Sequence, residues 1–358
     1  MVHVILAILV CRESSAWLDT TVDLAKDPQA GGVLKVACAF LYAAADTDAE
    51  NVRLRTLPGL LVAFDQLRAT DEELSFVAVT FLPQRDDDFF GVGLLRTRGF
   101  VINDECARLW PFEFSFGAST FCKFVVWSLV EYELVLYLDA DVEVKQPLFA
   151  EMFLRPTSLI VQLALHGGAP VVLGKCRGDF KTNIAFLNGG LILLRPDAHV
   201  SARLLGLASD VRLAANASSP ENFRWVRVHG LPSPIYTIHE QSLLANFFIR
   251  RPQGMWLIPA DFVHSPRVRL HPSPQAHLYQ NGSVNVTRTS HLPSAWAAKP
   301  LPFIHYAGKC KPHVTCLQDP SRRQCKKAFC MDWAAHVHRI AAGDADFRRT
   351  LNSSGTVK

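Results

Sequence analysis

The stretch ELVLYLDADVEV, residues 133–144, decides the fold class. Five apolar residues, Leu134–Leu138, run without alternation into two carboxylates, Asp139 and Asp141. Such a run is typical of a strand that is buried on both faces of a parallel sheet. Ligands bind beyond the carboxyl ends of the strands in these sheets, so both aspartates are expected at a binding edge. Because residues i and i+2 of an extended chain point to the same side, the pair can offer oxygen ligands to one Mg²⁺ or Mn²⁺.

The segments around this strand alternate between strand and helix patterns. Strands are predicted at residues 35–43, 74–83, 98–105 and, interrupted by a glycine pair, 185–197. Helices are predicted at residues 57–68, with Pro58 in the first turn, and at 119–132 and 236–248. This order predicts an α/β fold with a parallel, doubly wound sheet. Residues 263–302, rich in Pro, Ser and His, are predicted to form an exposed loop.

The composition is that of a globular protein with a mild positive charge. The chain has 358 residues, of which 49% are hydrophobic and 20% charged, and its formal net charge is +4. This charge fits an anionic ligand as well as a membrane surface, so membrane association stays open, whereas a nucleic-acid partner is not expected. The sequence contains no run of 18 apolar residues, so no transmembrane helix is predicted. The N-terminal segment, residues 1–30, begins with an apolar run that fits a signal peptide or an extra strand equally well.

Cysteines and glycosylation sequons favour the secretory route. The four cysteines of the predicted C-terminal tail region lack a CxxC pair, which favours two disulfides over a zinc site. They are Cys310, Cys316, Cys325 and Cys330, and residues 316–358 are predicted to form a basic, Cys-containing tail. The odd total of nine leaves a free thiol, for which Cys11 is a candidate. The N-x-[ST] sequons lie at Asn216, Asn281, Asn285 and Asn352. A glycoprotein of the Golgi lumen or a secreted protein is therefore expected, with the cytoplasm as the alternative.

A D-x-D motif alone is weak evidence, because most occurrences are solvated turns. Two enzyme classes end a buried strand in this way: haloacid-dehalogenase-like phosphatases, where the first Asp attacks phosphorus, and nucleotide-sugar glycosyltransferases, where the pair holds a metal under a diphosphate. The phosphatase pattern needs the motif near the chain start and a later G-D-x-x-x-D. Here the motif begins at Asp139, and GDADF at 343–347 lacks that spacing. The glycosyltransferase interpretation is favoured.

Four motifs in order resemble the glycogenin-like family of retaining glycosyltransferases. They are CKFVVWSLVEYELVLYLDADVEV at 122–144, FLNGGLILLRP at 186–196, HEQSLLANFF at 239–248 and HYAGKCKPH at 305–313. The resemblance covers about residues 33–313. It implies a GT-A fold: a Rossmann-like, mixed and mostly parallel central sheet flanked by helices, in a single catalytic domain at residues 31–315. It also implies metal-dependent transfer of a sugar from a UDP-sugar, unless the chain is a catalytically inactive relative that only binds the donor.

The resemblance assigns the metal and the diphosphate to particular residues. Asp139, Asp141 and His305 would bind Mn²⁺, with Mg²⁺ as the alternative ion, although a single histidine is more often a buried core residue. Lys311 would contact the diphosphate and stabilise the charge that develops on the departing UDP. Gly308 would let the diphosphate approach the backbone.

The donor sugar is assigned in the same way. Asn188 corresponds to a sugar-contacting Asn, and Gly189 and Gly190 would let the sugar lie against the backbone, although a glycine pair also suits a turn that needs positive φ. Lys123 matches a lysine near the donor sugar, and its alternative is a solvated position on a helix. Ala140, between the two aspartates, completes the predicted donor site.

Glu240 and Gln241 match the family's Asp-Gln pair near the reacting carbon and complete, with Lys311, the predicted catalytic set. Glu stands here where the family has Asp, and Thr237 to Glu240 also fits a capping box. The family's base-contacting Tyr is absent, so Ala43, Ala44 and Asp46 are placed along the edge that meets uracil. The sugar is not identified, and the acceptor is a glycan, a protein or a small polyol.

Overall fold

The structure is a computed structural model that describes separate stretches of the chain between residues 34 and 353. Residues 1–33, which include Cys11, and the segment that holds Cys310, Cys316 and Cys325 lie outside them. The described residues are 34–43, 49–81, 91–106, 118–144, 153–155, 158–167, 169–174, 177–178, 185–186, 189–217, 226–228, 231–233, 240–249, 251, 254–263, 267–270, 275–280, 283–288, 303–305 and 327–353.

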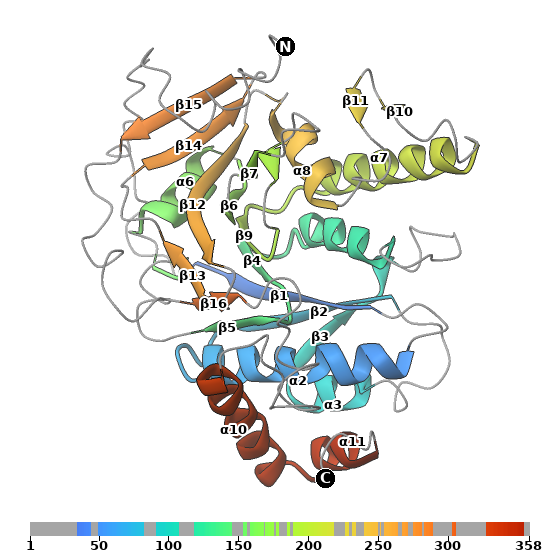
Figure 1. Ribbon diagram of the computed structural model, residues 1–358, viewed down its shortest axis with the longest axis vertical. Helices are drawn as coiled ribbons and strands as arrows, with labels where there is room; N and C mark the ends of the chain where they lie inside the picture. The colour runs from blue at the N-terminus through green and yellow to red at the C-terminus, as the bar shows by residue number, and fades with distance from the viewer. Residues whose placement is uncertain are drawn as a thin grey trace.

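A mixed sheet forms the centre of the molecule (Figure 1). Within the described residues it has ten strands in the order β15-β14-β12-β6-β9-β4-β1-β2-β3, with β13 paired to β12. The strands are β1 (Val36–Ala43), β2 (Ser75–Phe81), β3 (Phe100–Asn103), β4 (Leu134–Leu138), β6 (Val171–Gly174), β9 (Leu191–Leu194), β12 (Met255–Val263), β13 (Arg267–Leu270), β14 (Gln275–Gln280) and β15 (Ser283–Arg288).

Most strands of this sheet run in one direction. β3, β2, β1 and β4 are mutually parallel neighbours, and β6 and β12 continue in the same direction beyond β9. β9 is antiparallel to both β4 and β6. The predicted architecture, a mixed and mostly parallel sheet flanked by helices, is confirmed.

Within the described residues, three two-stranded antiparallel ladders are separate from the main sheet. β5 (Val142–Val144) pairs with β16 (Phe303–His305) directly after the D-x-D motif. β7 (Arg177–Gly178) pairs with β8 (Ala185–Phe186), and β10 (Val226–Val228) pairs with β11 (Leu231–Ser233). The β5–β16 ladder brings residues 303–305, which are distant in the sequence, next to the end of β4.

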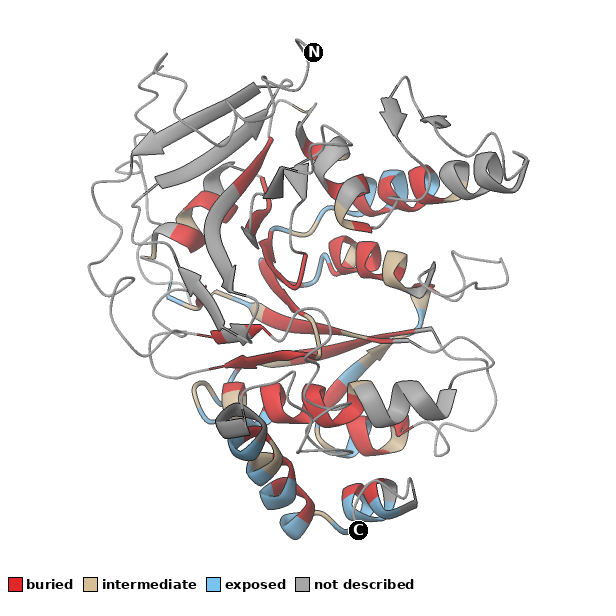
Figure 2. Cartoon of the chain, in the orientation of Figure 1, coloured by how far each residue is buried: buried red, intermediate tan, exposed pale blue. Residues whose placement is uncertain are grey.

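Helices cover both faces of the sheet and enclose two apolar clusters (Figures 1 and 2). The helices that contribute to the first cluster are α2 (Ala49–Arg68), α3 (Val92–Thr97), α6 (Leu159–Gly167), α10 (Lys327–Gly343) and α11 (Ala345–Ser353). Those of the second are η1 (Ala118–Ser128), α7 (Ala198–Ala217) and α8 (Glu240–Ile249). Side chains of β4 alternate between the two, so that Leu134, Leu136 and Leu138 join the first cluster and Val135 and Tyr137 the second.

Two predicted helices differ from the structure in start or type. α2 begins at Ala49, so Pro58 lies inside the helix and not in its first turn. Proline there removes a backbone donor, but Leu57, Leu60 and Leu61 are buried around it and their packing offsets the loss. The helix predicted over 119–132 is a 3₁₀ helix, η1, which ends at Ser128.

The prediction of an exposed loop over residues 263–302 is wrong. β13, β14 and β15 occupy much of this region, and β14 and β15 form an antiparallel hairpin that extends the sheet. The prolines and histidines of this region favour a loop, although the sequence also contains two signals of a hairpin. The sequence alternates between apolar and polar residues in QAHLYQ and SVNVTR, and Asn281–Gly282 between them is a strong turn signal.

The C-terminal helices α10 and α11 belong to the core below α2 and α3 (Figure 1). Trp333 and Val337 of α10 and Phe347 of α11 are buried in the same apolar cluster as the helix α2. No helix within the described residues is long and apolar enough to span a bilayer.

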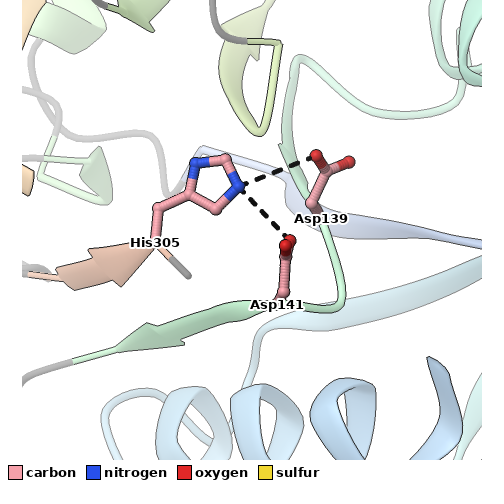
Figure 3. A group of neighbouring side chains, drawn as sticks. All are labelled: Asp139, Asp141 and His305. Atoms are coloured by element: carbon pink, nitrogen blue, oxygen red, sulfur yellow. Dashed lines mark ion pairs between the residues drawn. The ribbon is translucent and has the colours of Figure 1, made fainter. Parts of the chain in front are cut away.

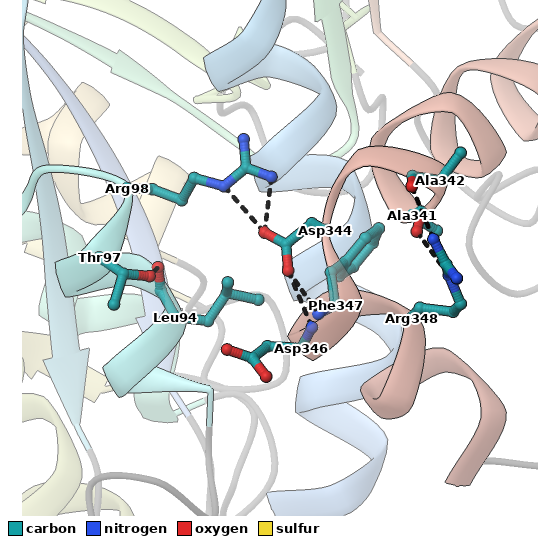
Figure 4. A network of polar contacts seen from close by, with 9 residues as sticks. All are labelled: Leu94, Thr97, Arg98, Ala341, Ala342, Asp344, Asp346, Phe347 and Arg348. Atoms are coloured by element: carbon teal, nitrogen blue, oxygen red, sulfur yellow. Dashed lines mark hydrogen bonds and ion pairs between the residues drawn. The ribbon is translucent and has the colours of Figure 1, made fainter.

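Asp344 joins these helices to the rest of the molecule (Figure 4). Its Oδ1 accepts hydrogen bonds from the amides of Asp346, at 3.0 Å, and Phe347, at 2.9 Å, which caps α11. Its Oδ2 accepts two hydrogen bonds from Arg98 after α3, at 3.1 and 2.6 Å. Burial alone would raise the pKa of Asp344, but the Phe347 amide and the Arg98 guanidinium lower it below the ordinary 3.8.

Replacing Asp344 by Ala is expected to lower the free energy of unfolding by about 2 kcal/mol near neutral pH, because a helix cap and a charge-assisted pair are lost. Since the pKa is lowered by folding, this contribution is present above pH 3.8 and is lost as the pH falls through the folded-state value. Chemical denaturation near pH 7 and near pH 2 measures both. Asp346→Ala is the matched control, because that side chain is 63% exposed and its pair with Arg349 lies on the surface. Equal losses in the two variants would contradict the expectation.

Candidate metal and donor site

Asp139, Asp141 and His305 meet at the carboxyl end of β4 (Figure 3). Asp139 directly follows β4, Asp141 directly precedes β5, and His305 ends β16, where it lies opposite Val142 of β5. His305 Nε2 is 3.3 Å from Asp141 Oδ1 and 4.0 Å from Asp139 Oδ2. Pairing of β16 with β5 therefore places the imidazole of His305 beside the two aspartates at the end of the buried strand β4.

The three side chains fit one divalent cation. Their ligand atoms all lie within 4.8 Å of one another, and neighbouring ligands around an octahedral Mg²⁺ or Mn²⁺ are roughly 3 Å apart. Two carboxylates and one imidazole suit such an ion. Asp141 and His305 are buried, whereas 27% of the Asp139 side chain is exposed. Further ligands can therefore enter from the side of Asp139.

Backbone hydrogen bonds fix the turn that carries the aspartates. The amide of Asp139 donates to the carbonyl of Gly190 at 2.9 Å, and the amide of Val142 donates to the carbonyl of Asp139 at 3.0 Å. Gly190 directly precedes β9, whose Leu191 pairs with Leu138 of β4. The glycine turn and the D-x-D turn are thus joined side by side.

Close approach requires a glycine at position 190 and leaves little room at position 189. A Cβ at Gly190 would overlap the ring of His305, and one at Gly189 would lie 3.3 Å from Gln241 Cγ and 3.6 Å from Lys123 Nζ. Neither glycine has the positive φ of a left-handed turn, so that alternative explanation is wrong. Gly190 makes room for His305, and contact of either glycine with a donor sugar stays a prediction.

Lys123 lies inside the site, and the alternative of a solvated helix position is wrong. The residue is 2% exposed. Its Nζ lies 3.2 Å from the carbonyl of Gly189, from Glu240 Oε1 and from Asp139 Oδ1. Burial alone would lower the pKa of Lys123, but the negative charges of Asp139 and Glu240 raise it above the ordinary 10.5.

Glu240 and Gln241 begin α8 beside the glycine turn. Glu240 is buried and pairs with Lys123, and Gln241 approaches Gly189. Thr237 lies outside the described residues, so the capping box stays a prediction. The structure brings these two of the three predicted catalytic residues to the same end of the sheet as the aspartates, and the third, Lys311, lies outside the described residues.

Tyr137 is a member of the site that the sequence analysis missed. Its hydroxyl donates to Asp139 Oδ1 at 2.6 Å, and Lys123 Nζ lies 4.8 Å from the centre of its ring. Burial and the nearby charge of Asp139 raise the pKa of Tyr137 well above 10. The sequence does contain a signal, since residues 137 and 139 share one side of an extended strand, but Tyr137 fits the apolar run equally well.

Other predicted site residues lie outside the described residues. These are Asn188, Gly308, Lys311, Ala44 and Asp46. Ala43 ends β1, and Ala140 is half-buried in the D-x-D turn.

A disulfide joins Cys106, shortly after β3, to Cys122, next to Lys123 in η1. It thereby ties the helix that carries Lys123 to the edge of the sheet. Cys38 in β1 is a free, buried thiol. The side chains of the predicted C-terminal disulfides lie outside the described residues.

Comparisons with known proteins do not assign the chain to a family. No protein-family model and no curated protein matches it. Among solved structures, a galactosyltransferase LgtC with donor and acceptor sugar analogues aligns at 15% identity and a TM-score of 0.44, covering 88% of this chain and 100% of that one. The glycosyltransferase GlyE of Streptococcus pneumoniae aligns at 12% and 0.40, covering 87% and 64%. Mouse xyloside xylosyltransferase 1 aligns at 14% and 0.37, covering 77% and 98%. These values are too low to carry an argument about chemistry.

Helix α2 supports the D-x-D turn from the other face of the sheet. A Cβ at Gly59 would overlap the carbonyl of Ala140, so the helix backbone and the turn are in close contact. Further along α2, Gln66 accepts a hydrogen bond from the amide of Val144 at 2.8 Å and approaches Glu143 Oε1 at 3.5 Å. The helix thus holds both the turn and the strand β5 that follows it.

Gly59→Ala is expected to destabilise the protein by about 2 kcal/mol, because the new methyl group forces α2 and the D-x-D turn apart. Gly206→Ala is the matched control. It also lies within a helix, α7, but its Cβ would meet nothing within 4 Å, so it should stabilise by up to about 1 kcal/mol. Urea denaturation of both variants measures the difference. A stabilised Gly59→Ala variant would show that the contact is not restrictive.

Proposed function

We propose that this chain is a metal-dependent, retaining glycosyltransferase of GT-A type that transfers a sugar from a UDP-sugar to an acceptor. The observation that carries the proposal is the meeting of Asp139, Asp141 and His305 at the carboxyl end of a central strand. The two aspartates come from one turn and His305 from the distant strand β16, and their ligand atoms all lie within 4.8 Å of one another. The resemblance of the four sequence motifs supports the same function.

The charges of the site support a divalent ion. When ionised, Asp139, Asp141 and Glu240 carry three negative charges, and Lys123 carries one positive charge within their ion pairs. Two negative charges remain among these groups, which is the charge that one Mn²⁺ or Mg²⁺ offsets. Like charges this close are otherwise costly.

Particular residues would then act on the donor. Asp139, Asp141 and His305 would hold the cation, which when bound polarises the diphosphate and offsets the charge of departing UDP. Lys311 and Gly308 follow His305 in the sequence and are proposed to bind the diphosphate. Asn188, with Gly189, is proposed to orient the sugar.

Glu240 and Gln241 are proposed to lie near the reacting carbon. The approach of Gln241 to Gly189, and the contact of Glu240 with Lys123, which also bonds the Gly189 carbonyl, support this. Lys123 holds the Glu240 carboxylate through Oε1 at 3.2 Å, which fixes its direction. The acceptor, a glycan, a protein or a small polyol, would enter from the exposed side of Asp139.

We also propose that the protein works in the secretory pathway or outside the cell. The Cys106–Cys122 disulfide supports this, because disulfides persist in oxidising compartments. The sequon residue Asn352 is exposed on α11 and is accessible to a glycan.

The activity is tested with a panel of UDP-glucose, UDP-galactose, UDP-glucuronate and UDP-xylose. UDP release from at least one of them is expected with Mn²⁺, and none after chelation with EDTA, because the ion stabilises the leaving group. Metal-dependent UDP binding without release from any donor would instead indicate a catalytically inactive relative. Phosphate release from p-nitrophenyl phosphate would favour a phosphatase.

Asp141→Asn is expected to weaken Mn²⁺-dependent UDP binding by at least about 100-fold, because a buried anionic ligand becomes neutral. Isothermal titration calorimetry with UDP, with and without Mn²⁺, measures this change. Asp65→Asn makes the same chemical change on the outer side of α2, where Asp65 pairs with His336, and should bind like the parent. Unchanged affinity in Asp141→Asn, with an unaltered circular dichroism spectrum, would refute the proposed metal site.

A further inference from the structure

We propose that Tyr137 and Lys123 are positioning residues of the metal site: they hold Oδ1 of Asp139 and so leave Oδ2 as the oxygen that meets the cation. This inference rests on the proposed function, because it divides the two oxygens of a proposed metal ligand between the protein and the ion.

A carboxylate at the rim of a sheet does not orient itself. The terminal torsion of Asp has broad preferences, and 27% of the Asp139 side chain is exposed. Without neighbours, either oxygen could turn toward the metal position or toward water. A ligand that must be oriented at each binding event binds more weakly than one that is already in place.

Tyr137 provides the first constraint on Oδ1. It lies two residues before Asp139 on the same strand, so both side chains project to the same side. Its hydroxyl is 2.6 Å from Oδ1, and because an ionised carboxylate only accepts hydrogen bonds, the tyrosine is the donor. The ring is buried in the cluster between β4 and η1. The packing of the ring therefore determines the position of the hydroxyl.

Lys123 provides the second constraint. An ammonium group has three N–H donors, and three acceptors lie 3.2 Å from Nζ: Asp139 Oδ1, Glu240 Oε1 and the Gly189 carbonyl. All donors are therefore engaged within the protein. Lys123 was predicted to lie near the donor sugar, and the geometry assigns its donors to the carboxylates and the glycine turn.

The other oxygen of Asp139 faces the metal position. Oδ2 is the atom that lies 4.0 Å from His305 Nε2, which in turn is 3.3 Å from Asp141. Tyr137 and Lys123 approach one side of the carboxylate and His305 the other. The division of the two oxygens thus follows from the positions of all three neighbours.

The first test compares Tyr137→Phe with Tyr132→Phe. Both remove one hydroxyl from a buried tyrosine, but Tyr132 precedes β4 and lies at its other end. Mn²⁺ affinity is measured by electron paramagnetic resonance of the free ion, without nucleotide and with UDP, and folding is checked by thermal melting. Tyr137→Phe should weaken Mn²⁺ binding about tenfold, the usual effect of losing a partner of a metal ligand. Tyr132→Phe should bind like the parent.

Lys123→Met tests the reassigned lysine with the metal alone. Methionine keeps the length of the side chain without its donors. The lost positive charge would by itself favour a cation, so the expected net weakening of Mn²⁺ binding, about tenfold even without nucleotide, reports the lost orientation of Asp139. A residue that contacted only the sugar would leave that affinity unchanged, and such a result would overturn the role of Lys123.

A second pair of variants does not depend on the packing of Tyr137. In Asp139→Asn, Tyr137 and Lys123 would draw the amide oxygen toward themselves and turn the NH₂ group, which cannot ligate, toward the ion. Asp139→Asn should therefore bind Mn²⁺ as weakly as Asp139→Ala. Clearly tighter binding by Asp139→Asn would overturn the division of the oxygens.

The outcomes separate this inference from the proposed function. If the parent protein binds no Mn²⁺, alone or with UDP, both fail. If the parent binds Mn²⁺, Asp141→Asn does not, and Tyr137→Phe binds like the parent, the metal site stands and the positioning role is wrong.

Discussion

Electrostatic repulsion among carboxylates at the carboxyl end of β4 is the constraint on which the rest of the structure depends. Asp139, Asp141 and Glu240 converge there, and two of them are buried. Buried charges persist only where they are paired and hydrogen-bonded. Lys123 joins Asp139 to Glu240, and His305 lies against Asp141. The structure therefore compensates one side of the cluster with its own cation and leaves the side of His305 suited to a divalent ion.

The topology of the sheet makes this convergence possible. β9 is antiparallel to β4, so the chain enters β9 at the edge where β4 ends. That reversal puts the Gly189–Gly190 turn beside Asp139, where the Gly190 carbonyl accepts the Asp139 amide. A parallel strand in the same place would begin at the opposite edge, and the turn would be out of reach. The short β5–β16 ladder then closes the site from the other direction by placing His305 against Gly190.

The sequence predicted the strand and its aspartates because both signals are local. An apolar run followed by D-x-D needs no distant partner to be recognised. The role of His305 came only from the resemblance of motifs, since no local pattern reveals the β5–β16 pairing. Lys123 was placed in the site, but its contacts were not predicted, because Glu240 approaches it through the packing of α8 against η1. Two local signals led to wrong predictions. Pro58 indicated a helix start near residue 57, but α2 begins at Ala49 because its apolar face is buried. The prolines of residues 263–302 indicated a loop where β14 and β15 form a hairpin.

Contacts from both faces of the sheet hold the residues of the site in place. On one face, Gly59 and Gln66 of α2 hold the D-x-D turn and β5. On the other, η1 carries Lys123 and is itself tied by the Cys106–Cys122 disulfide. Catalytic stabilisation of charge is strongest where the groups are already oriented, because none has to reorganise during the reaction. In the proposed function, the donor and the acceptor would enter at the exposed flank of Asp139, whereas the side chains proposed to hold the ion are anchored on the sheet.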